Sequence, residues 1–311
     1  MGVLRRRTEV SGQPLRMTGE VRIGRGPDND LIVARPSVSG RHAVIRWVDG
    51  SWILRDASKH GTLVNGQLVK GASARLAVGD VLTFVEDDEV WCLEDASPPG
   101  LLLRPVNGSE SDEIYVDAGA LHAFPSREHP NETIFQIGDA WIHEAQSGVR
   151  TELRDGSRVN VLGVEYMVSA PREASETTEP RRAAASWSLD CAELSIVVFR
   201  GEDEAELTIS SGAAERTVKA SRPLYLLAYL AEQRIKEAPE VSASDAGHGW
   251  IPLALACSDL GVDRQVLNVD VHRVREAVKS TGLGNAANVI ERRPNQIRIG
   301  VPADRVRVTR G

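Results

Sequence analysis

The feature that most constrains this fold is an alternation of apolar and polar residues that runs from residue 3 to about residue 95. Ala43, Ile45 and Trp47, for example, fall on one face of an extended chain. Short apolar runs such as Val81–Val85 follow Gly-Asp or acidic turns. Many short strands at this spacing predict an all-β sandwich or barrel.

Three polar clusters, each containing glycine, interrupt this alternation at residues 24–25, 39–42 and 60–66. A phosphorylated threonine carries a charge close to minus two and three acceptor oxygens. A site for it needs a forked donor and short hydroxyl donors on rigid turns. Arg25 and Ser39 supply these two groups at a spacing that neighbouring loops can bring together.

In their order and spacing, the Gly-Arg pair, the Ser-x-x-His block and the Gly-Thr…Asn-Gly block resemble the forkhead-associated (FHA) domain. The resemblance covers roughly the first third of the chain. It implies a β-sandwich whose loops bind phosphothreonine peptides. The phosphothreonine-binding residues that it implies are Arg25, Ser39, Gly40, Arg41, Lys59, His60 and Asn65, and the residues that support the loops are His42, Gly61 and Thr62.

Two positions depart from the family pattern. His60 replaces the asparagine that is usual before Gly-Thr, and a ring nitrogen does not reproduce an amide that donates and accepts at once. Gly40 removes a side chain that often touches the peptide. The alternative is a degenerate sandwich that makes contacts independent of phosphate. The presence of both Arg25 and Ser39 favours phosphate binding.

A chain of 311 residues has room for two or three domains. No apolar run approaches the length of a membrane span and no signal peptide is evident. The three cysteines, Cys92, Cys191 and Cys257, lack the paired spacing of a disulfide framework or a zinc site, which is typical of a reducing cytoplasm. The net charge is −7, yet residues 261–311 hold ten basic against five acidic residues. This balance allows one basic face near the C-terminus.

Residues 98–169 are also predicted to form strands, and their pattern repeats parts of the first domain. The block Ser126–His129 has the spacing of Ser39–His42, and Trp141-Ile142 matches Trp52-Ile53. No Gly-Arg pair precedes Ser126 at a matching distance, so this copy is expected to bind no phosphate. The region is either a degenerate FHA-like repeat or an unrelated small β-domain.

A flexible linker is predicted at residues 170–187, which are polar, charged and bounded by prolines. Thr177 and Thr178 lie in it and would be accessible to a kinase. A linker phosphorylated there could bind in cis to the Arg25 site, although most linker threonines have no such role.

The period of the apolar residues changes in the last domain, residues 188–311. Strands are predicted at Leu194–Phe199, Leu207–Ser210 and Thr217–Lys219, followed by a helix that starts near Pro223. A short helix over Pro252–Leu260 and a longer one from about Arg264 to Ser280 follow. Leu267, Val271, Val274 and Val278 give the longer helix an apolar stripe, and a hairpin around residues 289–299 closes the domain.

This order resembles the response-regulator type of winged-helix DNA-binding domain, although the loop at 237–249 is long and the usual Gly-Tyr of the wing is replaced by Gln296-Ile297-Arg298. Opposite the apolar stripe, the long helix carries groups that can pair with bases or phosphates in a major groove. Two arginines lie at the hairpin tip. The predicted DNA-binding residues are Arg264, Gln265, Asn268, His272, Arg275, Lys279, Arg292 and Arg293. The alternative is a solvated polar face, which any amphipathic helix has.

Catalytic motifs are missing from the sequence. Gly24-Arg25-Gly26 lacks both a third glycine and a Walker lysine, and His143-Glu144 lacks the second histidine of a zinc-binding helix. We therefore expect no enzyme, no cofactor and no metal site.

Together these features predict a cytoplasmic, bacterial transcription regulator. Its FHA-like sandwich (residues 1–97) would bind a phosphothreonine protein or peptide produced by a Ser/Thr kinase, and its winged helix (residues 188–311) would bind double-stranded promoter DNA. A homodimer is compatible with this arrangement. The alternative is a phosphothreonine-dependent adaptor whose winged helix contacts protein. The salt dependence of binding separates the two.

Overall fold

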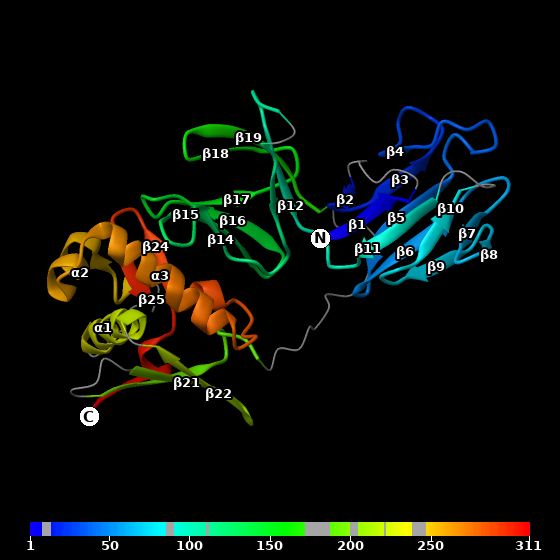
Figure 1. The fold of residues 1–311 in the computed structure, drawn as a ribbon. Helices are drawn as coiled ribbons and strands as arrows, with labels where there is room; N and C mark the ends of the chain where they lie inside the picture. The colour runs from blue at the N-terminus through cyan, green and yellow to red at the C-terminus, as the bar shows by residue number, and fades with distance from the viewer. Residues whose placement is uncertain are drawn as a thin grey trace. The chain divides into compact units, whose positions relative to one another are not determined.

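The computed structural model describes residues 1–7, 14–84, 90–109, 112–171, 187–199, 205–220, 222–237 and 247–311 (Figure 1). The chain forms two compact units. The first comprises residues 1–118, 154–159 and 165–177, and the second comprises residues 119–153, 160–164 and 178–311. Both units therefore contain parts of the range 98–169. Most of the expected linker, including Thr177 and Thr178, lies outside the described residues, as does most of the long loop before residue 247.

The described residues among the first 95 form two facing sheets around one hydrophobic core. The first sheet has the order β2-β1-β11-β10-β7-β8 and the second the order β4-β3-β5-β6-β9. Alternate residues of these strands, such as Ile45, Trp52 and Leu93, are fully buried, as the sequence pattern predicts. The strands are β1 (Gly2–Arg6), β2 (Leu15–Met17), β3 (Val21–Gly24), β4 (Leu31–Ile32), β5 (Ala43–Val48), β6 (Ser51–Asp56), β7 (Thr62–Val64), β8 (Gln67–Val69), β9 (Ser73–Leu76), β10 (Val81–Thr83) and β11 (Val90–Asp95).

The following residues form two further sheets of four strands. The first unit contains most of the sheet β13-β12-β19-β18, and the second unit contains the sheet β14-β15-β16-β17. The strands are β12 (Leu101–Pro105), β13 (Ile114–Val116), β14 (His122–Pro125), β15 (Pro130–Ile137), β16 (Ala140–Glu144), β17 (Arg150–Leu153), β18 (Arg158–Val161) and β19 (Val164–Ser169).

These two sheets repeat the strand order of the N-terminal sandwich. The order β13-β12-β19-β18 corresponds to β2-β1-β11-β10, and β14-β15-β16-β17 corresponds to β3-β5-β6-β9. The register repeats too, because Trp52 pairs with Leu76 and Trp141 pairs with Leu153. Residues 101–169 thus have the strand order and pairing of the N-terminal sandwich, as a degenerate repeat would, which is one of the two alternatives that the sequence leaves open.

Leu76 and Leu153 are each followed by a turn, and this turn has the same hydrogen bond in both copies. Gly79 N donates to Leu93 O at 2.7 Å, and Gly156 N donates to Val168 O at 2.8 Å. Both glycines have positive φ, 91° and 76°, a conformation that glycine adopts without steric cost.

The copies differ in the loops that carry the phosphate-binding clusters. Residues 25–42 separate β3 from β5, whereas only residues 126–129 separate β14 from β15. Residues 57–72, which include β7 and β8, separate β6 from β9, whereas only residues 145–149 separate β16 from β17. The second copy therefore keeps the strands and lacks the long loops.

The C-terminal part of the second unit combines a sheet, three helices and a small second sheet around its own core. The larger sheet has the order β22-β21-β20-β26, in which β26 runs parallel to β20, and the smaller has the order β23-β25-β24. The elements are β20 (Glu193–Val198), β21 (Ala205–Ser211), β22 (Ala214–Ala220), α1 (Arg222–Glu237), β23 (Ile251–Pro252), α2 (Leu253–Leu260), α3 (Arg264–Lys279), η4 (Ala286–Val289), β24 (Ile290–Arg293), β25 (Gln296–Ile299), η5 (Ala303–Arg305) and β26 (Val306–Arg310).

The connection between α2 and α3 follows from its capping residues. Gly261 ends α2 in the left-handed region at φ 64°, and its N–H bonds to carbonyls of the last turn. Asp263 then caps α3 by accepting the Val266 N–H at 2.8 Å. Both helix boundaries agree with those expected from the sequence.

Candidate functional site

The loop between β3 and β5 is folded back on itself at the predicted phosphate-binding residues. Arg25 N donates to Ser39 O at 2.9 Å, and Gly26 N donates to Gly40 O at 3.0 Å. The side-chain amide of Asn29 donates to the carbonyls of Gly26 and Gly40, at 2.7 Å each. These bonds place Arg25 and Ser39 side by side although fourteen positions separate them in the sequence.

A glycine at the end of β3 makes this approach possible. A Cβ atom on Gly24 would lie 2.5 Å from Gly40 O and 2.9 Å from Ser39 O, which is closer than van der Waals contact allows. At Gly40 itself a Cβ would meet nothing within 4 Å. The two glycines therefore have different roles, one in packing and one at the surface.

Ser39 also joins this loop to the next one. Its Oγ accepts the Lys59 N–H at 3.1 Å, and its own N–H donates to Nδ1 of His42 at 3.3 Å. The side chains of Arg25, Arg41, Lys59 and His60 are exposed. Arg25, Arg41 and Lys59 thus place exposed cations on the two loops that Ser39 connects, and this arrangement suits an anionic ligand.

His42 is fully buried beneath these loops. Its N–H donates to Ile23 O at 2.8 Å, its carbonyl accepts the Ala57 N–H at 2.9 Å, and its ring meets Phe84 edge to face. Burial lowers the pKa of His42, although Asp56 opposes the shift. A neutral ring can then accept the Ser39 N–H at Nδ1, so His42 holds the loop in the way that the family resemblance implies.

A buried carboxylate, Asp56, organises the second loop. It accepts the Oγ of Ser58 at 2.8 Å, the Oγ1 of Thr62 at 2.9 Å and the N–H of Gly71 at 2.9 Å. The Oγ of Ser58 in turn accepts the Gly61 N–H at 2.7 Å. Thr62 and Gly61 therefore lie where a supporting role for the loop requires them.

The side-chain hydrogen bonds of Asn65 set it apart from the other residues predicted to bind phosphothreonine. Its amide nitrogen donates to Asp80 at 2.8 Å and its amide oxygen accepts the Val81 N–H at 2.9 Å. It lies at φ 52° in the turn between β7 and β8. Both ends of the amide therefore contact the domain itself, and these contacts fix the turn rather than present a free donor to a peptide.

Sequence reasoning missed Asn29, Asp56 and Ser58. The signals that could have found them are local. Asn29 lies in a Pro-Asp-Asn-Asp stretch, where asparagine commonly bonds to backbone groups, and Asp56 follows a strand directly before a serine.

The predicted DNA-binding residues of α3 have a different environment. Asn268, His272 and Arg275 are 3%, 3% and 1% exposed. α3 packs against β15, so one sheet of the second copy covers this side of the helix (Figure 1). The periodicity that placed these residues on one side of the helix is right. In this structure, however, they do not form the open face that the sequence predicts.

Glu144, at the end of β16, contacts this covered surface. Arg275 donates to both of its oxygens at 2.9 Å, Arg150 approaches at 3.0 Å and Arg292 at 3.7 Å. Burial would raise the pKa of Glu144, but Arg275, Arg150 and Arg292 outweigh it and lower the pKa to about 2. The carboxylate is therefore ionised at neutral pH.

The remaining predicted residues lie at the edge of this surface. Arg264 and Arg292 both donate to the carbonyl of Gln146, at 3.1 and 3.0 Å. Arg292 is 6% exposed, so it too is absent from the open surface. Gln265 and Arg293 are exposed and Lys279 is half-buried. Arg293 lies over the ring of Trp250, 4.2 Å from its centroid.

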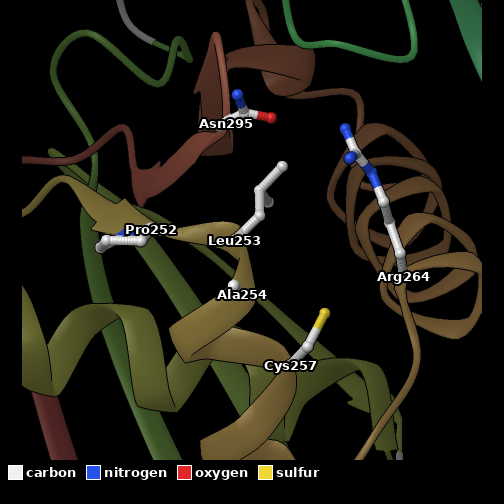
Figure 2. A pocket seen from close by; sticks show the side chains of 6 residues that line it. All are labelled: Pro252, Leu253, Ala254, Cys257, Arg264 and Asn295. Atoms are coloured by element: carbon white, nitrogen blue, oxygen red, sulfur yellow. The ribbon is translucent and has the colours of Figure 1, made fainter.

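A pocket of about 400 Å³ lies between α2, the start of α3 and the β24–β25 turn (Figure 2). Figure 2 shows the side chain of Leu253 and the sulfur of Cys257 directed into this space. Burial raises the pKa of the Cys257 thiol. The lining residues are Pro252, Leu253, Ala254, Cys257, Arg264 and Asn295.

Within the described ranges, no group of three or more His, Cys, Asp and Glu side chains is placed to hold a metal ion. No helix in the part of the chain that the structure describes is long and apolar enough to span a membrane.

Comparison with known proteins identifies the N-terminal fold. Residues 21–85 match the FHA domain family. The ABC transporter ATP-binding/permease protein Rv1747 of Mycobacterium tuberculosis is 40% identical to this chain over 130 residues. The match covers 36% of this chain, and the chain spans 15% of the length of that relative.

Solved structures match nearly a third of the chain. The FhaA FHA domain, complexed with the intracellular domain of Rv3910, is 30% identical, with a TM-score of 0.27. That match covers 30% of this chain and 99% of the FhaA domain. Mycobacterium tuberculosis EmbR, in complex with a low affinity phosphopeptide, is 26% identical with a TM-score of 0.27, covering 31% of this chain and 25% of EmbR. From the family match and the sandwich described above, residues 21–85 form an FHA domain.

Proposed function

We propose that this chain is a phosphothreonine-dependent transcription regulator. In this proposal the FHA domain binds a phosphothreonine protein or peptide made by a Ser/Thr kinase. The observation that carries it is the double attachment of Ser39, whose backbone carbonyl bonds to Arg25 N–H and whose hydroxyl bonds to Lys59 N–H. A guanidinium, a hydroxyl and further cations are thereby held on two connected loops, as a doubly charged ester requires.

DNA binding is proposed for the C-terminal domain. Two helices, α2 and α3, are joined by the three residues Gly261–Asp263, and the β24–β25 hairpin follows α3. Helix-turn-helix domains use such a turn and read the major groove with the second helix. The leading sheet, the three helices and the hairpin support assignment to the winged-helix class.

A second candidate function is a phosphothreonine-dependent adaptor whose C-terminal domain contacts protein. The burial of Arg275 and His272 against a neighbouring sheet favours it, because this side of α3 already packs on a protein surface. The binding of an adaptor to its protein partners would depend little on DNA.

Two measurements test these functions. Titration of a degenerate phosphothreonine peptide library into the full chain should give saturable binding that Arg25→Ala abolishes and that Arg75→Ala, at an exposed arginine of β9, leaves unchanged. A mobility-shift assay with genomic fragments at two salt concentrations addresses DNA. Binding through several phosphates should weaken steeply with salt. Full peptide affinity in Arg25→Ala contradicts the first assignment, and absence of a shift at low salt favours the adaptor.

A further inference from the structure

The β14–β17 sheet contacts α3 and the β24–β25 hairpin through the end that corresponds to the phosphopeptide-binding end of the FHA domain. Its two short loops, residues 126–129 and 145–149, occupy the positions of loops 25–42 and 57–72 in the first copy. Gln146 O accepts from Arg264 and Arg292. Arg127 lies 4.0 Å from Glu276 of α3. At this end the second copy thus contacts another segment of the same chain, α3 and the β24–β25 hairpin.

Glu144 supplies the anion in this contact. Arg275 meets it with two parallel hydrogen bonds of 2.9 Å, the geometry with which arginine also binds a phosphate or a guanine edge. Arg275 and Glu144 are 1% and 2% exposed. Removal of one partner from such a buried pair leaves the other charge uncompensated, which strongly destabilises the contact.

Two neighbouring polar side chains, Asn268 and His272, are buried without hydrogen-bond partners among the described residues. Neither polar atom of the Asn268 amide and neither ring nitrogen of His272 has a hydrogen-bond partner among the described residues. Buried polar groups nearly always have partners, and each exception needs an explanation. Asn268, His272 and Arg275 recur at helical spacing, and an asparagine on such a stripe pairs with adenine when the helix lies in a major groove.

We propose that the β14–β17 sheet reversibly covers a DNA-binding surface on α3 and β24–β25, with Glu144 in the place of an anionic group of DNA. The inference rests on the proposed DNA-binding function. It adds that DNA and the sheet compete for Arg275, so that the closed arrangement binds DNA weakly and separation of the sheet exposes the surface. A ligand shifts such an equilibrium only by binding one state better than the other.

The first test is Glu144→Gln in the full chain, with DNA binding followed by the anisotropy of a labelled random-sequence duplex. Loss of the carboxylate weakens the closed contact, so we expect DNA affinity at least about ten-fold higher than in the native chain, the size of effect that a 1.4 kcal/mol shift gives. Glu152→Gln is the matched control. It makes the same change of charge at an exposed position of β17.

The second test locks the sheet in place. Asn295 N lies 3.3 Å from Ser147 O, so the pair Ser147→Cys and Asn295→Cys can form a disulfide across the contact. Cys92→Ser, Cys191→Ser and Cys257→Ser in the same chain prevent other pairings. The oxidised form should bind DNA at least about ten-fold more weakly than the reduced form.

The outcomes separate the inference from the function on which it rests. Higher affinity in Glu144→Gln, together with loss of binding on oxidation, supports the inference. Equal affinity in the oxidised and reduced forms leaves DNA binding in place and overturns the masking. Absence of binding in every form, while amide hydrogen exchange in α3 rises in Glu144→Gln and exchange in α1 does not, overturns DNA binding itself.

Discussion

The side-chain oxygen of Ser39 accepts the backbone N–H of Lys59 at 3.1 Å, and this bond connects the two loops of the candidate phosphate site. Ser39→Ala removes both this bond and a hydroxyl that can donate to phosphate. A hydrogen bond to a charged group contributes about 1.5–3 kcal/mol. We therefore expect phosphothreonine-peptide affinity to fall by about 10- to 100-fold, measured by isothermal titration calorimetry.

Ser39→Thr keeps a hydroxyl and should restore most of this affinity, whereas Ser37→Ala, at an exposed serine of the same loop, should have no effect. Unchanged affinity in Ser39→Ala would show that the hydroxyl does not reach the ligand.

Gly24 and Gly40 provide a second, matched prediction. In Gly24→Ala the new methyl group would meet Gly40 O at 2.5 Å. The loop must move, and the bond between Arg25 N and Ser39 O is lost. Peptide affinity should fall at least about ten-fold. Gly40→Ala has open space around its Cβ and should retain affinity and stability. Similar calorimetric results for the two variants would contradict the role of Gly24 in the approach of the two loop segments.

Asp56 should stabilise the FHA domain through its charge. Burial would raise its pKa, but hydrogen bonds from Gly71, Ser58 and Thr62 outweigh burial and lower the pKa below 3.8. The stabilisation is therefore present above pH 3.8 and is lost as the pH falls through the lower value of the folded state. Asp56→Asn places amide hydrogens against these donors and should cost about 2–4 kcal/mol.

The measurement is hydrogen exchange of the β5 and β6 amides at increasing urea concentration, because a chain of several domains does not unfold in one step. Asp49→Asn is the control. It replaces an exposed residue at φ 47° with one that tolerates this conformation, and should change stability by less than about 0.5 kcal/mol.

His272 should make the second unit sensitive to acid. Burial, together with Arg275, Arg127 and Lys279, lowers its pKa to about 4, while Glu128 opposes the shift. The unfolded chain takes up a proton near pH 6.5 and the folded chain does not. Stability should therefore fall as the pH drops from about 6.5 to about 4, by up to about 1.4 kcal/mol per pH unit.

His272→Gln should flatten this profile, measured by hydrogen exchange of the α3 amides between pH 7.5 and pH 5 after correction for the intrinsic exchange rate. His129→Gln changes an exposed histidine of the same unit and serves as the control. A profile as steep in His272→Gln as in the native chain would assign the acid sensitivity to other groups.

Local signals predicted much of this fold. Gly261 and Asp263 marked the boundary between α2 and α3, and Trp52 and Trp141 marked equivalent strands of two copies. Alternation and capping depend on neighbours in the sequence, so they can be read without coordinates. The turn between β18 and β19 was not predictable in this way, because Leu162 and Gly163 turn the chain at positive φ, and leucine does not signal such a turn.

The position of the candidate site was predictable and its supporting contacts were not. Arg25 and Ser39 carry recognisable chemistry, whereas Asn29 acts through two carbonyls that only the folded loop brings together. Helical periodicity likewise placed Asn268 and His272 on a polar side of α3. Periodicity does not say what packs against a polar side, so it could not predict the sheet that covers Asn268 and His272.

The second copy and α3 lie on one chain, and this lowers the binding strength that their contacts require. A receptor and a ligand on one chain meet at an effective concentration that reaches the millimolar range for short connections. Contacts too weak to capture a free protein therefore suffice between residues 126–149 and α3. The second copy can recognise its neighbour without a phosphorylated residue, and any free competitor must overcome the advantage of proximity.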